Sequence, residues 1–128
     1  MEYYFSKTLN VSFDEALRLT VEALKVEGFG VITEINMHDK LKEKLNVDFK
    51  RYTILGACNP PFAYKALQAE DKIGTMLPCN VLVIEQGQNK IEIAAVNPIA
   101  SMQAIANPAL GDVAQQVTEK LKKVIDTL

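Results

Sequence analysis

The sequence predicts a single domain, residues 1–128, that combines about five β-strands with several α-helices. Runs rich in β-branched and aromatic residues alternate with segments whose apolar residues recur at helical spacing. No linker, internal repeat or low-complexity stretch marks a second domain. The chain has 128 residues, of which 48% are hydrophobic and 23% charged, and is therefore large enough to bury a core without disulfides or metal ions.

The first two predicted elements are a strand over residues 3–9 and an amphipathic helix after it. Ser12 and Glu15 match a capping box, in which the Ser12 hydroxyl accepts the Glu15 N–H and the Glu15 carboxylate reaches back. Gly28 is expected to end this helix. Its apolar stripe consists of Phe13, Ala16, Leu17, Thr20 and Leu24.

A second strand, a short helix and a third strand are predicted next. The strand covers residues 29–35, and strict alternation would place on one face Phe29, Val31, Thr33 and Ile35. Asn36 is expected to cap a short helix with an apolar residue at every fourth position, namely Met37, Leu41 and Leu45. Residues 51–57 form the third predicted strand.

A hairpin and a long helix complete the chain. Residues 81–85 and 91–96 flank the polar segment Gln86-Gly87-Gln88-Asn89, which is typical of an antiparallel hairpin. Three Asn-Pro pairs, at positions 59–60, 97–98 and 107–108, are each expected to begin a helix, because asparagine is a favoured N-cap and proline fits the first helical position. The stripe of the last helix consists of Leu110, Val113, Val117, Leu121, Val124 and Leu128.

The charge balance and the apolar segments argue against several classes of function. The chain has 14 basic and 16 acidic residues, a net charge of -2, so it lacks the basic surface that nucleic-acid binding favours. No apolar run reaches the roughly 18 residues that a membrane helix needs, and the first residues do not match a signal peptide. We therefore expect a cytoplasmic protein with no nucleic-acid or membrane partner and with two reduced cysteines.

Cysteine and asparagine adjoin twice, at Cys58-Asn59 after the third strand and at Cys79-Asn80 before the hairpin. If these strands are neighbours, both pairs meet at one region of the sheet. Cys58 would then lie beside a helix N-terminus, whose N–H groups stabilise a thiolate or bind an anion. This pattern favours a small-ligand or thiol site formed by Cys58, Asn59, Cys79 and Asn80. The alternative is that both cysteines pack as small hydrophobic side chains.

Other polar residues carry weaker signals. Glu34 is a further candidate for the ligand site, because it could do acid–base chemistry with Glu92 if both shared a dry pocket, although solvated carboxylates are commoner. His38 is expected at the surface. The segment 28–30 lacks the third glycine of a dinucleotide fingerprint, and no serine lies in a nucleophile elbow. The sequence thus identifies no catalytic residue and no cofactor, and it leaves a metal site open.

Five segments together carry a family resemblance: residues 28–35, 41–45, 52–61, 77–81 and 107–110. The most specific part is Gly56-Ala57-Cys58-Asn59-Pro60-Pro61. These segments are similar to the bacterial and archaeal family catalogued as domain of unknown function 302. The resemblance implies an α+β fold with an antiparallel sheet of about five strands packed with helices in a TATA-binding-protein-like arrangement, but no TATA-box function. Many members have histidine where this chain has Tyr64, and this departure weakens any metal or acid–base site there.

Three functions are compatible with these residues. The preferred one is a non-catalytic, dimerising module with a small-ligand pocket near the two Cys-Asn pairs. The alternative is a thiol-dependent or metal-binding enzyme that uses Cys58 or Cys79, which requires a thiol with a lowered pKa or further metal ligands. The third is a homodimer that forms through an apolar patch, with core burial as the competing explanation for its residues Met76, Leu77, Met102 and Ile105.

Overall fold

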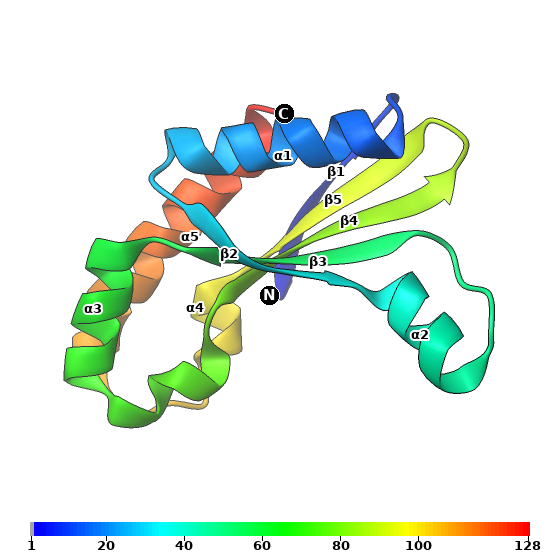
Figure 1. Cartoon of the computed structure of the whole chain (residues 1–128). Coiled ribbons are helices and arrows are strands. Elements are labelled where there is room, and N and C mark those ends of the chain that lie inside the picture. Colours follow the sequence, from blue (N-terminus) through cyan, green and yellow to red (C-terminus); the bar gives the residue numbers. More distant parts are fainter. Residues whose placement is uncertain (1) are drawn as a thin grey trace.

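The computed structural model describes residues 2–128 and contains a five-stranded antiparallel sheet with the strand order β1-β5-β4-β3-β2 (Figure 1). This architecture confirms the predicted α+β fold. The strand order is compatible with the TATA-binding-protein-like arrangement that the resemblance implies. The strands are β1 (Tyr4–Leu9), β2 (Gly30–Asn36), β3 (Tyr52–Cys58), β4 (Cys79–Gly87) and β5 (Lys90–Val96).

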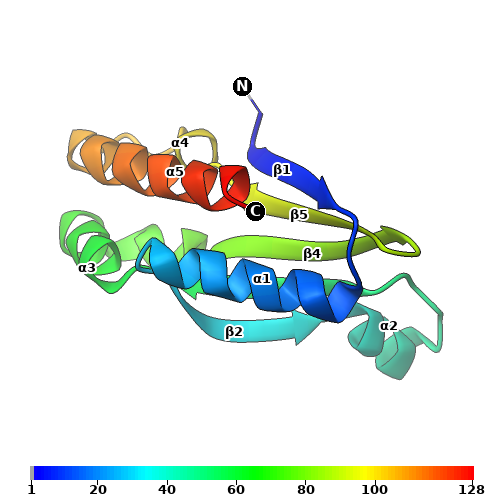
Figure 2. The same cartoon turned by 90° about the horizontal axis from the view of Figure 1, so that it is seen from above.

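Helices α1 and α5 lie together on one face of the sheet, which we call the covered face (Figure 2). The opposite face, called the open face, carries Tyr52, Ile54, Leu82, Ile84 and Ala94, and no helix crosses it within the described chain (Figure 1). Helix α2 lies at one end of the sheet, whereas α3 and α4 lie at the other. The helices are α1 (Phe13–Val26), α2 (Met37–Leu45), α3 (Pro60–Ala69), α4 (Pro98–Ser101) and α5 (Gly111–Asp126), with short 3-10 helices η1 (Asp71–Met76) and η2 (Pro108–Leu110).

The core lies between the covered face and the two long helices. Alternate residues of β4 and β5 point into it, because successive side chains of a strand point to opposite faces. The stripe predicted for α1 faces the same core, and its one polar member, Thr20, is fully buried with its hydroxyl donating to the Ala16 carbonyl at 2.7 Å. The fully buried members of this core include Ala16, Leu24, Val81, Val83, Ile91, Ile93, Leu121 and Val124. Among the described residues, no helix is both long and apolar enough to cross a membrane.

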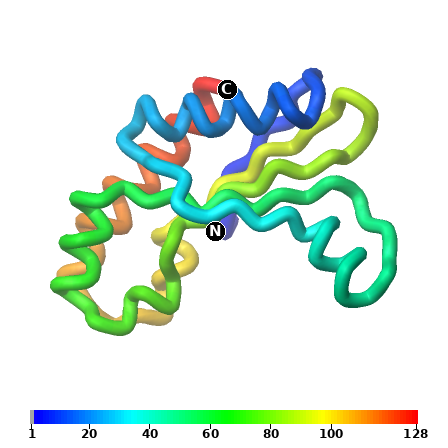
Figure 3. The backbone as a smooth tube through the Cα atoms, in the orientation of Figure 1, coloured from blue at the N-terminus to red at the C-terminus, as the bar shows by residue number. Residues whose placement is uncertain are grey.

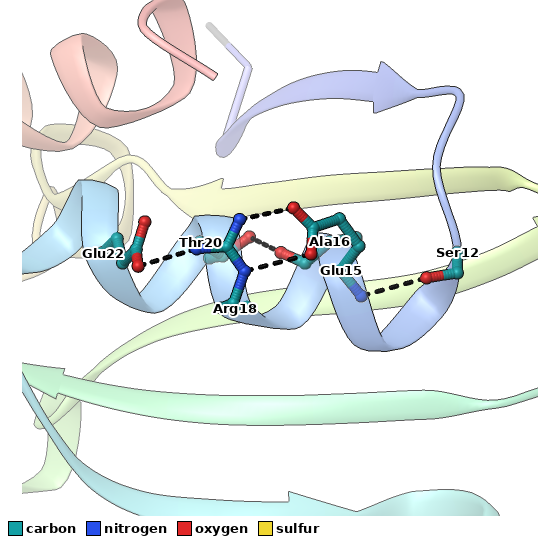
Figure 4. Close-up of polar contacts among 6 residues, drawn as sticks. All are labelled: Ser12, Glu15, Ala16, Arg18, Thr20 and Glu22. Carbon is teal, nitrogen blue, oxygen red and sulfur yellow. Dashed lines mark hydrogen bonds and ion pairs between the residues drawn. The ribbon is translucent and has the colours of Figure 1, made fainter.

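Helix α1 begins where the sequence predicts, with Ser12 Oγ accepting the Glu15 N–H at 3.2 Å (Figure 4). The second half of the predicted capping box is wrong. The Glu15 carboxylate accepts from Arg18 Nε at 3.0 Å, and Arg18 also donates to Glu22 at 2.8 Å. A guanidinium one turn away offers a charge-assisted hydrogen bond, which is stronger than the bond to a neutral N–H.

Strand β2 contains a bulge that the sequence analysis missed. Val31 pairs with Ala57, yet Thr33 pairs with the next residue, Gly56, so that Ile32 is an extra residue between them. An extra residue reverses the face on which the following side chains lie. Val31 therefore packs against the core, whereas Thr33 and Ile35 lie on the open face, and the expectation of a single shared face is wrong.

Helix α2 is held to β3 by two polar side chains. Asn36 occupies the N-cap position of α2, as predicted, but its side chain makes no capping bond. Its Oδ1 instead accepts from Thr53 Oγ1, on the neighbouring strand, at 2.8 Å. His38 Nδ1 accepts the main-chain N–H of Tyr52 at 2.9 Å, and its side chain is only 18% exposed. The expectation of a surface histidine is therefore wrong, because the ring makes a structural contact with β3.

The three Asn-Pro pairs begin α3, α4 and η2, as predicted. Asn97 and Asn107 also cap these helices through their side chains. Asn59 makes no such cap. The three asparagines make the same kind of tertiary contact. The side-chain amide of each donates to a main-chain carbonyl far away in the sequence: Glu27 for Asn59, Glu2 for Asn97 and Ala69 for Asn107.

Candidate functional site

At one end of the sheet, β3 runs into α3 and η1 leads back into β4 (Figure 3). A cavity of about 260 Å³ is lined by residues from this end of β3, α3 and β4. The pairing of Ala57 with Cys79 makes β3 and β4 neighbours there, so the two cysteines reach the same region. We call this space the thiol cavity. Its walls come from β2, β3, β4, α3, α4 and α5, and include Cys58, Cys79, Phe62, Ala63, Met102 and Val117.

Three of the five predicted ligand residues line the thiol cavity: Cys58, Asn59 and Cys79. Asn80 does not, because it follows Cys79 in a strand and therefore points to the open face, where it lines a second cavity. Glu34 lies exposed on the edge strand β2 and lines neither cavity. The structure also separates Glu34 from Glu92, since Glu92 lines the second cavity.

Asn59 has a structural partner inside the site. The residue is 8% exposed, and its Nδ2 donates to the carbonyl oxygen of Glu27 at 3.1 Å. The adjoining Gly28 has a φ of +88°, and a Cβ there would lie 3.1 Å from the Asn59 amide nitrogen. The Asn59 amide nitrogen is thus bonded to the turn between α1 and β2. This bond uses one of the few hydrogen-bonding groups that the cavity wall could offer to a ligand.

The two thiols differ in their surroundings. Cys79 is 8% exposed, and burial, followed by the nearby Cys58, raises the pKa of its thiol to about 11. Cys79 is therefore a neutral thiol at pH 7. Cys58 is half-buried and lies two residues before Pro60, the first residue of α3, so it is beside this helix start, as expected. However, Pro60 and Pro61 have no N–H, so this helix start offers fewer donors to a thiolate than the sequence analysis assumed.

The lining of the thiol cavity is almost wholly apolar. None of its residues carries a charged side chain, and Asn59 is its one amide. Two of the lining residues are exposed to solvent, Ile32 at 62% and Leu67 at 46%, so the cavity is open on their side. Within residues 2–128, no group of three or more His, Cys, Asp or Glu side chains is placed to hold a metal ion. The geometry thus suits an uncharged, apolar guest.

The second cavity, of about 380 Å³, lies on the open face and was missed by the sequence analysis. We call it the tyrosine cavity, because Tyr3, Tyr4 and Tyr52 line it together with Asn80 and Glu92. Tyr52 and Glu92 belong to different strands, 40 positions apart by their numbers. Only the alternation of side chains in each strand could have indicated that they share a face.

The apolar patch proposed for a dimer is mostly buried within the chain. Leu77, Met102 and Ile105 pack against a second, smaller core formed by Ala66, Ile73 and Leu110. Met76 is 41% exposed. Tyr64, the position where the resemblance implies histidine in other chains, is 66% exposed on α3 and lines neither cavity.

Comparisons with known proteins agree with the sequence resemblance. A crystal structure of an uncharacterised conserved protein DUF302 from Bacillus stearothermophilus matches with a TM-score of 0.90 and 28% identity over 98% of each chain. No curated protein matches this sequence. The family model described as "Domain of unknown function DUF302" matches residues 5–128. This chain therefore belongs to the DUF302 family.

Proposed function

We propose that the domain is a non-catalytic module that binds a small, uncharged apolar molecule in the thiol cavity. The observation that carries this proposal is the cavity itself, which has about 260 Å³ of space beside Cys58 and Cys79 and no charged side chain in its lining. Binding sites for small molecules are concave and mostly apolar. Burial of apolar surface would supply the affinity, at about 25 cal/mol per Å².

The size of the thiol cavity supports a guest of the size of a substituted benzene. An apolar cavity of roughly 150 Å³ is enough to take up benzene, and this one is larger. The half-buried Cys58 and the buried Cys79 would contact the guest as soft, polarizable groups. The hydrogen bond from Asn59 to the Glu27 carbonyl would hold this part of the cavity wall in place.

A cavity-filling variant tests the proposal with toluene as the probe. In Ala63→Phe a ring is added to a residue of the cavity wall, whereas in the matched control Gln68→Phe the same ring is added to an exposed position of α3 outside it. Toluene should raise the Tm of the parent and of Gln68→Phe, but not of Ala63→Phe. Circular dichroism would check that both variants fold. Equal responses in all three proteins, or none in the parent, would contradict the proposal.

Self-association into a homodimer is the second part of the proposal, and edge strand β2 supports it. An edge strand presents unpaired N–H and C=O groups that can pair with a second copy. Two apolar side chains of β2 are solvent-exposed, Ile32 at 62% and Ile35 at 40%. Sedimentation velocity over a range of concentrations should show a dimer that Ile35→Lys weakens and the α1 control Val21→Lys does not. A monomer at every concentration would contradict this part.

A further inference from the structure

The tyrosine cavity combines an apolar floor with aromatic walls. Across three neighbouring strands of the open face, Tyr52 lies opposite Ile84, and Ile84 lies opposite Glu92. Leu82 and Ala94 continue the floor. At the other side, the rings of Tyr3 and Tyr4 meet edge to face, with their centroids 4.9 Å apart and their planes at 69°.

Glu92 supplies a negative charge with no counter-ion in the described chain. Glu92 as a residue is partly buried, and its carboxylate accepts a hydrogen bond from Gln86 Nε2 at 2.9 Å in an exposed position. None of the residues that line the cavity is basic. The pKa of the Tyr52 phenol is raised, first by burial and then by the nearby Tyr3 and Glu92.

From this arrangement we propose that the tyrosine cavity binds a small organic ammonium ion, with the alkyl groups against Tyr3, Tyr4 and Tyr52 and the positive charge near Glu92. The faces of aromatic rings attract cations, and quaternary ammonium ions are the ligands that aromatic cages typically recognise. The Glu92 carboxylate, in a cavity lining without a basic residue, attracts a ligand of opposite charge. An anion would be repelled by Glu92, and a neutral apolar molecule would leave that carboxylate without a counter-ion.

This inference concerns a site separate from the thiol cavity and does not depend on the proposed function. The two cavities share none of their lining residues, and they open on different parts of the fold. A variant of one cavity can therefore be measured without changing the walls of the other.

Choline and its neutral isostere 3,3-dimethylbutan-1-ol provide a matched pair of probes, since they differ in one atom and in charge. Isothermal titration or amide chemical shifts would report binding to the full chain. Choline should bind saturably and change the amide chemical shifts of residues around Tyr52 and Glu92. The neutral isostere should bind about tenfold more weakly, as expected when the charge–aromatic and charge–charge attractions are removed.

Three variants separate the contributions. Glu92→Gln retains the shape but removes the charge, and Tyr3→Ala removes one ring from a side chain that is 70% exposed, so the fold should be preserved. Each should weaken choline binding about fivefold to tenfold. Glu85→Gln, on the same hairpin but paired with the core residue Ile91, should leave binding unchanged. The inference would be overturned by equal affinity for both probes, by no saturable choline binding, or by unchanged affinity in Glu92→Gln.

Discussion

The side-chain amide of Asn59 donates a hydrogen bond of 3.1 Å to the main-chain carbonyl of Glu27. Glu27 is the C-cap residue that follows α1, and Asn59 is the residue before α3 begins. The bond therefore joins the end of one helix to the start of another, 32 positions later. It also fixes one wall of the thiol cavity, because Asn59 lines that cavity.

Replacement of Asn59 by alanine should lower the free energy of unfolding. The Glu27 carbonyl would lose its side-chain donor in a partly buried place, which costs about 1–3 kcal/mol. Urea denaturation followed by circular dichroism measures this change. Asn80→Ala is the matched control, because Asn80 follows the other cysteine but is exposed, and we expect a change below about 0.5 kcal/mol there. Equal losses in the two variants would contradict the role of Asn59.

Replacement of Gly56 by alanine should also destabilise the fold. A Cβ at this position would lie 2.0 Å from Thr33 Oγ1 and 2.7 Å from Pro78 Cγ, and the proline ring cannot rotate away. Overpacking of this kind costs about 1–3 kcal/mol. Gly30→Ala, in the neighbouring strand, meets no atom within 4 Å and serves as the control in thermal unfolding. If both variants melt at the same temperature, the close approach to Gly56 has no energetic effect.

Alkylation should distinguish the two cysteines. With a thiol pKa of about 11, Cys79 has roughly one thiolate in a thousand molecules at pH 8. We expect iodoacetamide to modify the half-buried Cys58 first and Cys79 only after unfolding in urea, as read by mass spectrometry. The variant Cys58→Ser isolates the slow thiol. Rapid modification of Cys79 in the folded protein would instead favour the thiol-enzyme alternative.

Alkaline pH should reduce stability through Cys79. Its thiol has a pKa of about 11 in the folded chain against an ordinary value of 9.0, so between these pH values the unfolded chain has lost a proton that the folded chain keeps. Stability therefore falls as pH rises from 9 to 11, by at most about 2–3 kcal/mol. Cys79→Ala lacks this proton and should show a flatter decline in urea denaturation. Parallel declines in the parent and the variant would contradict this linkage.

The positions of the helices could be predicted because their signals are local. The stripe from Phe13 to Leu24 is buried as expected, and each Asn-Pro pair begins a helix. The hairpin between β4 and β5 follows from a short polar turn between two β-rich runs. The bulge at Ile32 was not predicted, because the sequence of β2 does not show where its pairing with β3 shifts by one residue.

The candidate sites depended on contacts between distant residues. The sequence could place Cys58 and Cys79 at strand ends, but the pairing of Ala57 with Cys79 decided that they meet. The same strand geometry sent Asn80 to the opposite face, where it joins Tyr52 and Glu92 in the tyrosine cavity.

By itself, the sequence determined the type of each main element, the buried faces of the long helices and the family. These features follow from periodicity, capping preferences and short motifs, which act within a few turns of chain. The tertiary structure alone decided the partners of Asn59 and His38, the face of each side chain after the bulge, and the two cavities. Those depend on which strands pair and in which register, and a shift of one residue there moves a side chain to the opposite face of the sheet.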